Sequence, residues 1–296
     1  MTVQGEHPGR IVLSVVIANW NTQGLLRDLL RSIEQHRPPF PFEVLVVDNG
    51  SADGSPAMVT GEFPWVILQS NAENLGYARA NNLGFACAGG EFILLLGSDT
   101  VVVDDSMNRM VEYLRSHADA GAVSCRLLNP DRTVQGSCRH FPTLMDGVLT
   151  YLSLHRMAPQ YNMEGFDFYR TQEVEQPAAT CLMLRRQTIE AVGLFDERFS
   201  ILYNDVDLCI RIRRAGWKIV YLADGEVIHH GSQSTQRASP ELRLEMYRNI
   251  LLYYETHVHP LAGWILRPIL AIRLALATRS FIGLRLITQN SMKGRS

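Results

Sequence analysis

Two aspartates end hydrophobic segments of the chain, where a carboxylate can bind a ligand. Asp99 follows Ser98 and the apolar segment 91–97. A carboxylate there can hold a divalent cation that neutralises a diphosphate, or it can cap the helix that follows. Asp48 ends the apolar segment 43–48 and precedes a loop rich in glycine and serine. It could accept a hydrogen bond from the imide N–H of a nucleobase, or it could stabilise that turn.

A basic residue and a pair of carboxylates are further candidates. Arg79 lies close to the expected start of a helix, where phosphate groups bind well, although it could equally be a solvated helix residue. Asp205 and Asp207 stand two residues apart at the start of another expected helix, so their side chains point in different directions. One could act as a general base while the other caps the helix or pairs with Arg211. The alternative is a capping arrangement without chemistry.

A histidine pair, His229 and His230, closely follows an apolar segment. One of the two imidazoles could bind a metal ion. A histidine pair is more often structural or exposed, so this motif by itself indicates little.

The hydrophobic pattern predicts the elements that position these residues. In the first hundred residues, short apolar segments alternate with segments of helical period. We expect strands at 11–17, 43–48, 65–69 and 91–97, helices at 23–37 and 77–88, and a short helix after the turn-rich loop at 49–55. Strands separated by helices form a mostly parallel sheet that is covered on both faces, which makes the fold class α/β. Ligands bind beyond the carboxyl ends of such strands, and here those ends carry the polar residues Asn19, Asn21, Asp48, Asn71, Asn74 and Asp99.

Beyond residue 100 the pattern is less regular. It predicts helices and strands at 104–117, 122–125, 178–184, 186–192, 205–215 and 218–222. Residues 128–176 are irregular and rich in proline and aromatic residues, and a loop-rich insert of that length is usually functional or mobile. We therefore expect a flexible N-terminus at 1–10, one domain at 11–237 and a basic, amphipathic helical tail at 238–296.

Composition excludes several classes of protein. The 296 residues are 46% hydrophobic and 20% charged, which is enough for a folded core and excludes a disordered chain. The net charge is −2, but from residue 248 onward seven basic residues stand against one acidic residue. A nucleic-acid-binding protein normally carries its basic face on the main domain, so we expect no nucleic acid partner. The five widely spaced cysteines form no CxxC pair and predict free thiols in a reducing compartment.

Taken together and in order, the motifs resemble the family 2 glycosyltransferases of the GT-A fold, and within them the rhamnosyltransferase-like branch. The resemblance covers about residues 10–235. The motifs that carry it are VVIANWN at 15–21, VVDNGS at 46–51, NLGYA at 74–78, LLGSDT at 95–100, GLFDERF at 193–199, NDVDLCIR at 204–211 and VIHHGS at 227–232.

The resemblance implies a role for each matching position. In that family the position of Asp48 contacts the base of a nucleotide-sugar. Asp99 matches the last aspartate of the DxD-type motif, here shortened to Ser98-Asp99, which binds Mg²⁺ or Mn²⁺ between the two phosphates. His229 matches a further metal ligand of some members. The implied nucleotide-sugar site comprises Asn19, Asn21, Asp48, Ser51, Asn74, Gly76, Arg79, Ser98 and Asp99, with residues 1–127 mainly binding the donor and 128–237 the acceptor.

Asp205 matches the catalytic base of the family. The usual pair there is Glu-Asp, whereas this chain has Asn204 before Asp205, which changes a neighbour that orients the acceptor. Asp205 would remove the proton from an acceptor hydroxyl as that oxygen attacks the anomeric carbon. A single base without a protein nucleophile near the sugar implies inversion at that carbon.

The function expected from this resemblance is inverting, metal-dependent transfer of a sugar, with dTDP-L-rhamnose as the favoured donor. The acceptor would be a hydroxyl of a glycan or of a polyprenyl-linked saccharide in cell-surface polysaccharide synthesis. A UDP-hexose or UDP-N-acetylhexosamine transferase is an alternative, because pocket shape rather than a motif selects the sugar. A nucleotide-sugar-binding protein with weakened catalysis is an alternative of another class, suggested by Asn204 and the shortened metal motif.

The tail suggests a location for the protein. Its apolar residues are interleaved with arginines, and Pro268 and Arg273 interrupt the apolar run too early for it to span a bilayer. Such a helix binds well to an anionic membrane surface, or the same face packs on the enzyme's own core or on a second subunit of a homodimer. We expect a cytoplasmic enzyme, peripheral at the inner face of the cell membrane. Without residues 240–296 it should lose membrane binding and keep donor binding.

Overall fold

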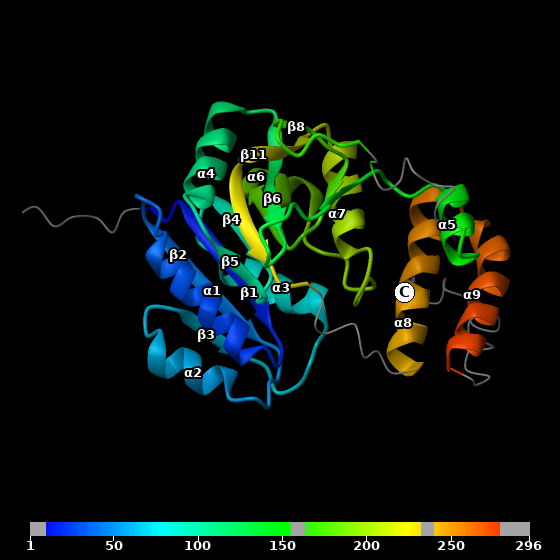
Figure 1. Cartoon of the computed structure of the whole chain (residues 1–296), viewed down its shortest axis with the longest axis horizontal. Coiled ribbons are helices and arrows are strands. Elements are labelled where there is room, and N and C mark those ends of the chain that lie inside the picture. The colour runs from blue at the N-terminus through cyan, green and yellow to red at the C-terminus, as the bar shows by residue number, and fades with distance from the viewer. Residues whose placement is uncertain (1–9, 155–162, 164, 232–239, 279–296) are drawn as a thin grey trace, which may run out of the picture.

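The protein is an α/β structure with one large central sheet, which confirms the expected fold class (Figure 1). The computed structural model describes residues 10–154, 163, 165–231 and 240–278. In these residues the sheet has nine strands, and helices cover both of its faces. The expected flexible N-terminus lies outside the described residues except for Arg10.

The first part of the sheet is parallel and alternates with helices as expected. Its strands lie in the order β3-β2-β1-β4. The elements are β1 (Leu13–Asn19), α1 (Gln23–Gln35), β2 (Phe42–Asp48), α2 (Ser55–Glu62), β3 (Ile67–Ser70), α3 (Tyr77–Cys87) and β4 (Phe92–Leu96). Helix α2 is the short helix expected after the loop at 49–55.

The second part of the sheet is mixed and continues in the order β10-β6-β11-β5 after β4. Strand β10 is antiparallel to both neighbours, β11 is parallel to β6, and β5 is antiparallel to β11. The elements are β5 (Thr100–Val102), α4 (Ser106–Ser116), β6 (Ala120–Leu128), β10 (Cys181–Arg185), α6 (Arg186–Val192), α7 (Asn204–Arg214) and β11 (Lys218–His229).

Strand β11 is longer than the sequence pattern predicts. The expected strand ended at residue 222, because Asp224, Gly225 and Glu226 break the apolar pattern soon after it. The structure absorbs these residues in a register shift against β6 between Leu222 and Glu226, after which pairing resumes as far as Ile228. The extension carries His229 to the carboxyl edge, opposite Thr100 of β5.

In its described residues, the insert between β6 and β10 is mostly irregular, as expected, but it includes the helix α5. It holds β7 (Cys138–Arg139), α5 (Leu144–Tyr151), β8 (Gln172–Glu173) and β9 (Gln176–Pro177). Helix α5 begins with a capping box, in which Thr143 and Asp146 each satisfy the other's backbone N–H.

Alternate residues of the strands point into two cores, one on each face of the sheet. Val15 and Ile17 contact the face covered by α1, α2 and α4, and Val16 contacts the face covered by α3, α6 and α7. This alternation fixes the register and holds the carboxyl ends of the strands at one edge.

The C-terminal region is helical, as expected, over residues 240–278. It comprises α8 (Pro240–Tyr253), a π-helical turn η2 (Tyr254–Val258) and α9 (Ala262–Thr278), and residues 279–296 lie outside the described part. A third core joins these helices to the domain, because Val206 and Ile210 of α7 pack with apolar side chains of α8 and α9. Packing on the enzyme's own core, the alternative weighed for this tail, therefore applies to one of its faces. No helix in the described residues is long and apolar enough to cross a membrane.

Candidate active site

Asp48 lies buried at the carboxyl edge of the sheet, beside Asn19. The parallel register pairs these two residues at the last positions of β1 and β2. Asn19 Nδ2 donates to Asp48 Oδ1 (2.8 Å), and the backbone N–H of Ser51 donates to Asp48 Oδ2 (2.9 Å). Each oxygen thus accepts one protein hydrogen bond and keeps a further lone pair, so Asp48 can still accept from a ligand N–H.

Asn21 and Ser51 bind the loops after β1 and β2 to each other. Asn21 has a left-handed backbone with φ of 53°, and its Oδ1 accepts from the backbone N–H of Ala52 at 2.8 Å. Its own backbone N–H donates to Ser51 Oγ at 2.9 Å. These contacts hold the two loops together at the carboxyl edge of the sheet.

Asn74 lies in the loop after β3 and binds both this loop and the loop after β2. Its Oδ1 accepts from Asn49 Nδ2 (2.8 Å) and from the backbone N–H of Gly76 (2.9 Å). Asn49 is buried and also accepts from the backbone N–H of Leu75 (3.0 Å), so it holds the β3–α3 loop against β2. Asn49 was not singled out from the sequence, although it stands in the motif that contains Asp48.

Arg79 and Gly76 lie at the first turn of α3. Gly76 has φ of 85° and precedes Tyr77, whose backbone N–H donates to the carbonyl of Ser200 (3.3 Å). Arg79 is exposed and makes no side-chain hydrogen bond or ion pair with any residue of the described ranges. Its guanidinium therefore remains available for an anion at this helix end.

Asp99 and His229 come together although they are far apart in the sequence. The antiparallel pairing of β5 with β11 brings His229 Nε2 to 3.4 Å from Asp99 Oδ2, with both side chains partly exposed. The backbone N–H of His230 also donates to the carbonyl of Asp99 (2.9 Å). Ser98, the residue before Asp99, contacts Thr22, with 2.9 Å between Ser98 Oγ and Thr22 Oγ1.

The Asp99–His229 pair fits a divalent cation that has further ligands from elsewhere. Adjacent ligands of a small octahedral cation lie about 3 Å apart, and one carboxylate oxygen plus an imidazole nitrogen is an acceptable donor set. Within the described residues, no group of three or more His, Cys, Asp or Glu side chains gathers around a possible metal position. Phosphate oxygens and water would therefore supply the remaining ligands of such a cation.

Asp205 lies in the first turn of α7, against the segment that leads into β10. Its carboxylate accepts from the backbone N–H groups of Val206 (2.8 Å) and Ala179, and Gln176 Nε2 lies 3.4 Å from its Oδ2. Burial raises the pKa of Asp205 above its usual value, and these hydrogen bonds offset only part of the effect. A carboxylate with a raised pKa is a stronger base when ionised.

Tyr77 is influenced by two of the carboxylates that the sequence singled out, Asp205 and Asp99. Burial raises its pKa, and the negative charges of Asp205 and Asp99 add to the effect. Its hydroxyl donates to the carbonyl of Ala179 (3.4 Å), next to the contact that holds Asp205. The segment that holds Asp205 also contacts the loop of Asp99, because the backbone N–H of Gly97 donates to the carbonyl of Thr180 (2.8 Å), the residue after Ala179. The expected base and the expected metal ligand therefore share one site.

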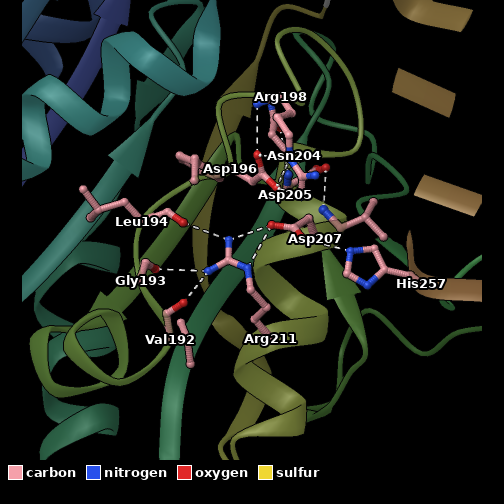
Figure 2. A network of polar contacts seen from close by, with 12 residues as sticks. Val192, Gly193, Leu194, Asp196, Arg198, Asn204, Asp205, Asp207, Arg211 and His257 are labelled. Atoms are coloured by element: carbon pink, nitrogen blue, oxygen red, sulfur yellow. Dashed lines mark hydrogen bonds and ion pairs between the residues drawn. The ribbon is translucent and has the colours of Figure 1, made fainter. Parts of the chain in front are cut away.

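Asp207 has the separate role that the sequence predicts. Arg211 donates to Asp207 Oδ2 through Nε (2.9 Å) and Nη2 (2.7 Å), which confirms the expected pair. The same guanidinium donates to the carbonyls of Val192 and Leu194 after α6 (Figure 2). A second partner of Asp207, which was not predicted, is His257 of the C-terminal region, at 2.8 Å from Oδ1.

The structure therefore places every residue of the predicted site at this edge of the sheet or in its adjoining loops and helix starts. The side chains with groups left for a ligand are Asp48, Arg79, Asp99, Asp205 and His229. The residues that sequence reasoning missed are Asn49, Tyr77, Gln135, Gln176 and His257. Of these, Asn49 and Tyr77 stand inside the motifs, whereas the other three carry no local signal.

Comparison with known proteins shows the family of the chain. The family model described as "Glycosyl transferase family 2" matches residues 14–193. The N-acetylglucosaminyl-diphospho-decaprenol L-rhamnosyltransferase of Mycobacterium tuberculosis is 30% identical over 266 residues, which covers 83% of this chain and 84% of that protein.

Solved structures share the fold. TarS of S. aureus superposes with a TM-score of 0.56 at 19% identity, over 88% of this chain and 43% of that longer chain. A mannosyltransferase of Pyrobaculum calidifontis, solved with GDP-Man and Mn2+, superposes with a TM-score of 0.55 at 19% identity, over 94% of this chain and 79% of that one. The chain belongs to glycosyl transferase family 2 and is a glycosyltransferase of the GT-A fold that resembles rhamnosyltransferases.

Proposed function

We propose that this enzyme transfers L-rhamnose from dTDP-L-rhamnose to a hydroxyl of a polyprenyl-linked saccharide, with inversion and with the help of a divalent cation. The observation that carries the proposal is the 30% identity to a rhamnosyltransferase whose name specifies a decaprenol-linked acceptor. The arrangement of Asp48, Asp99 and Asp205 along one edge of the sheet supports it. The product would serve cell-surface polysaccharide synthesis.

The donor would lie along the carboxyl ends of β1, β2 and β4. Asp48 would accept from the imide N–H of the base, with Asn19 and Ser51 holding its carboxylate in place. The diphosphate would lie between Asp99 and the first turn of α3, where Arg79 and the helix N-terminus offset negative charge. This orientation directs the anomeric carbon toward Asp205.

Asp99 and His229 would hold Mg²⁺ or Mn²⁺, as their separation of 3.4 Å permits. The cation, when bound, neutralises charge that develops on the departing diphosphate. The mannosyltransferase that shares this fold was solved with Mn2+, which supports the choice of a divalent ion.

Asp205 would act as the catalytic base. Its carboxylate accepts the proton of the acceptor hydroxyl while that oxygen forms a bond to the anomeric carbon. The bond from the anomeric carbon to the diphosphate oxygen breaks, and its electron pair leaves with the nucleoside diphosphate. Because attack and departure take place on opposite faces, the configuration at the anomeric carbon is inverted.

A polyprenyl-linked acceptor requires contact with a bilayer, and one surface of the protein suits this. Trp264 is 81% exposed and Leu276 is 76% exposed on α9, and Met145 is 63% exposed on α5, which packs against α9. These helices lie at the end of the molecule remote from most of the sheet (Figure 1). Exposed tryptophan and aliphatic side chains bind the membrane interface. The sequence that continues after α9, residues 279–296, contains four basic and no acidic residues, which complements an anionic surface.

The function is tested with the full chain, a decaprenyl-diphosphate N-acetylglucosamine acceptor and a panel of donors. Transfer from dTDP-L-rhamnose, lost in excess chelator and restored by Mg²⁺ or Mn²⁺, is the expected result, with the product identified by mass spectrometry. Transfer from UDP-glucose or UDP-N-acetylglucosamine alone would support the alternative donor class. Binding of dTDP-L-rhamnose without any transfer or hydrolysis would instead support the binding protein.

Membrane binding is tested by sedimentation with vesicles that contain anionic lipid. The variant Trp264→Glu/Leu276→Glu should bind more weakly, while Ile67→Glu, at an exposed position on β3, should bind like the wild type. High salt should weaken binding of all three proteins. Equal binding by all three at low salt would exclude this surface as the membrane contact.

A further inference from the structure

Gln135, a residue of the insert between β6 and β10, binds the Nδ1 side of the His229 ring, whereas Nε2 faces Asp99. His229 Nδ1 lies 2.6 Å from Gln135 Oε1, and Gln135 Nε2 is 3.4 Å from the carbonyl oxygen of His229. The amide of one glutamine therefore contacts both the ring and the backbone of this histidine. Gln135 itself is anchored, because its backbone N–H donates to the carbonyl of Leu127 (2.8 Å).

A chain of hydrogen bonds fixes which end of the Gln135 amide faces the histidine. An ionised aspartate can only accept, so Thr133 Oγ1 donates to Asp131 Oδ1 (2.6 Å). Thr133 Oγ1 is then the acceptor for Asn129 Nδ2 (2.9 Å), which turns Asn129 Oδ1 toward Gln135 Nε2 (2.9 Å). Gln135 Oε1 is left to face His229 as an acceptor.

This direction determines the state of the histidine ring. Because Gln135 Oε1 accepts, His229 Nδ1 carries the proton and, in the neutral ring, Nε2 presents its lone pair. That lone pair lies 3.4 Å from a carboxylate oxygen of Asp99, which is also an acceptor. Two acceptors that face each other repel unless a positive species lies between them.

We propose that Gln135 is a positioning residue, which selects the Nδ1–H tautomer of His229 and directs Nε2 toward the cation bound by Asp99. The inference rests on the proposed metal-dependent function and adds to it a residue that touches neither substrate nor cation. Outer hydrogen bonds of this kind typically change metal affinity by about 10–100-fold.

Two substitutions separate positioning from a merely structural role. Gln135→Met keeps the length of the side chain and removes the acceptor, whereas Gln135→Glu keeps an acceptor for the Nδ1 proton. Gln172→Met is the control, since the same substitution in β8 removes the side-chain hydrogen bond of Gln172 to the carbonyl of Asp167, away from the site.

Mn²⁺ binding is measured by electron paramagnetic resonance with the full chain in the presence of dTDP. The expected result is an affinity about 10–100-fold lower for Gln135→Met, with wild-type behaviour in Gln172→Met and most of the affinity retained in Gln135→Glu. A second readout uses no metal. Long-range ¹H–¹⁵N spectra of the histidine-labelled protein should show His229 as the Nδ1–H tautomer in the wild type and as a mixture in Gln135→Met.

The outcomes distinguish this inference from the proposed function. Equal Mn²⁺ affinity and an unchanged tautomer in Gln135→Met would overturn the role of Gln135 while leaving a metal-dependent enzyme. Absence of Mn²⁺ binding by the wild type would overturn the metal site, and with it the role of Gln135 in directing a ligand.

Discussion

His257 Nε2 lies 2.8 Å from Asp207 Oδ1, so a polar contact joins the C-terminal helices to the helical turn that carries Asp205. The side chains of His257 and Asp207 are only 5% and 4% exposed. Because Arg211 occupies the other oxygen of Asp207, the carboxylate is bound from both sides (Figure 2). The position of the expected base therefore depends on residues well beyond its own helix.

Replacing His257 should destabilise the whole protein. His257→Leu leaves one oxygen of a buried carboxylate without its partner, which should cost about 1.5–3 kcal/mol, the usual value for a hydrogen bond to a charged group. The measurement is the free energy of urea unfolding. His140→Leu, at a position 48% exposed, should change it little, and an equal loss in both variants would contradict the role given to His257.

Replacing the base should affect chemistry and leave donor binding unchanged. Asp205→Asn should lower kcat by about 10²–10⁴-fold, the usual contribution of general-base catalysis. The dissociation constant for dTDP, measured by calorimetry, should remain close to that of the wild type, since the proposed function places Asp205 on the acceptor side. A variant that fails to bind dTDP would move Asp205 into the nucleotide site.

The raised pKa of Asp205 should also appear in the pH dependence of stability. A carboxyl whose pKa is higher in the folded state binds its proton more tightly there, so folding is favoured while that proton is retained. As the pH rises from about 4, the ordinary aspartate value, through the folded-state pKa, the wild type should lose stability relative to Asp205→Asn. Melting temperatures of both proteins across that window test the sign, and a wild type that gains stability relative to Asp205→Asn as the pH rises would contradict it.

Gly97→Ala should weaken metal binding with little loss of stability. A Cβ atom at Gly97 would lie 2.9 Å from Asp99 Oδ1 and only in close van der Waals range of Thr100 and Thr180. The flexible carboxylate should therefore shift, which changes its alignment with His229. The comparison is Mn²⁺ affinity in Gly97→Ala and in Gly24→Ala, where nothing lies within 4 Å of the added methyl group, and equal affinities would show that the carboxylate tolerates the methyl group.

Removing the C-terminal helices should unfold the protein, contrary to what the sequence suggests. Val206 and Ile210 are buried against α8 and α9, and Phe199 is buried in the same core. A chain that ends at residue 239 would expose this apolar surface and would leave Asp207 without its partner His257. Circular dichroism and dTDP binding of the truncated chain test this, and a stable, dTDP-binding product would restore the interpretation of a separable tail.

Sequence reasoning succeeded where local pattern determines position. The alternation of strands and helices places Asn19, Asp48 and Asp99 at one edge, because parallel strands end together. It failed where contacts are non-local and the segments have no period. Gln135 stands in an irregular loop, and His257 stands in a π-helical turn with no distinguishing motif.

The pairing of β5 with β11 sets when the proposed cation site can first form during synthesis of the chain. Asp99 leaves the ribosome early, whereas His229 follows only after the insert, β10 and α7. Contacts between such distant segments form late, because the chain must close a long loop before it gains from them. The nascent N-terminal half therefore presents Asp99 alone, and tight binding at the proposed cation site would mark the closure of the β5–β11 pair rather than the folding of the first strands.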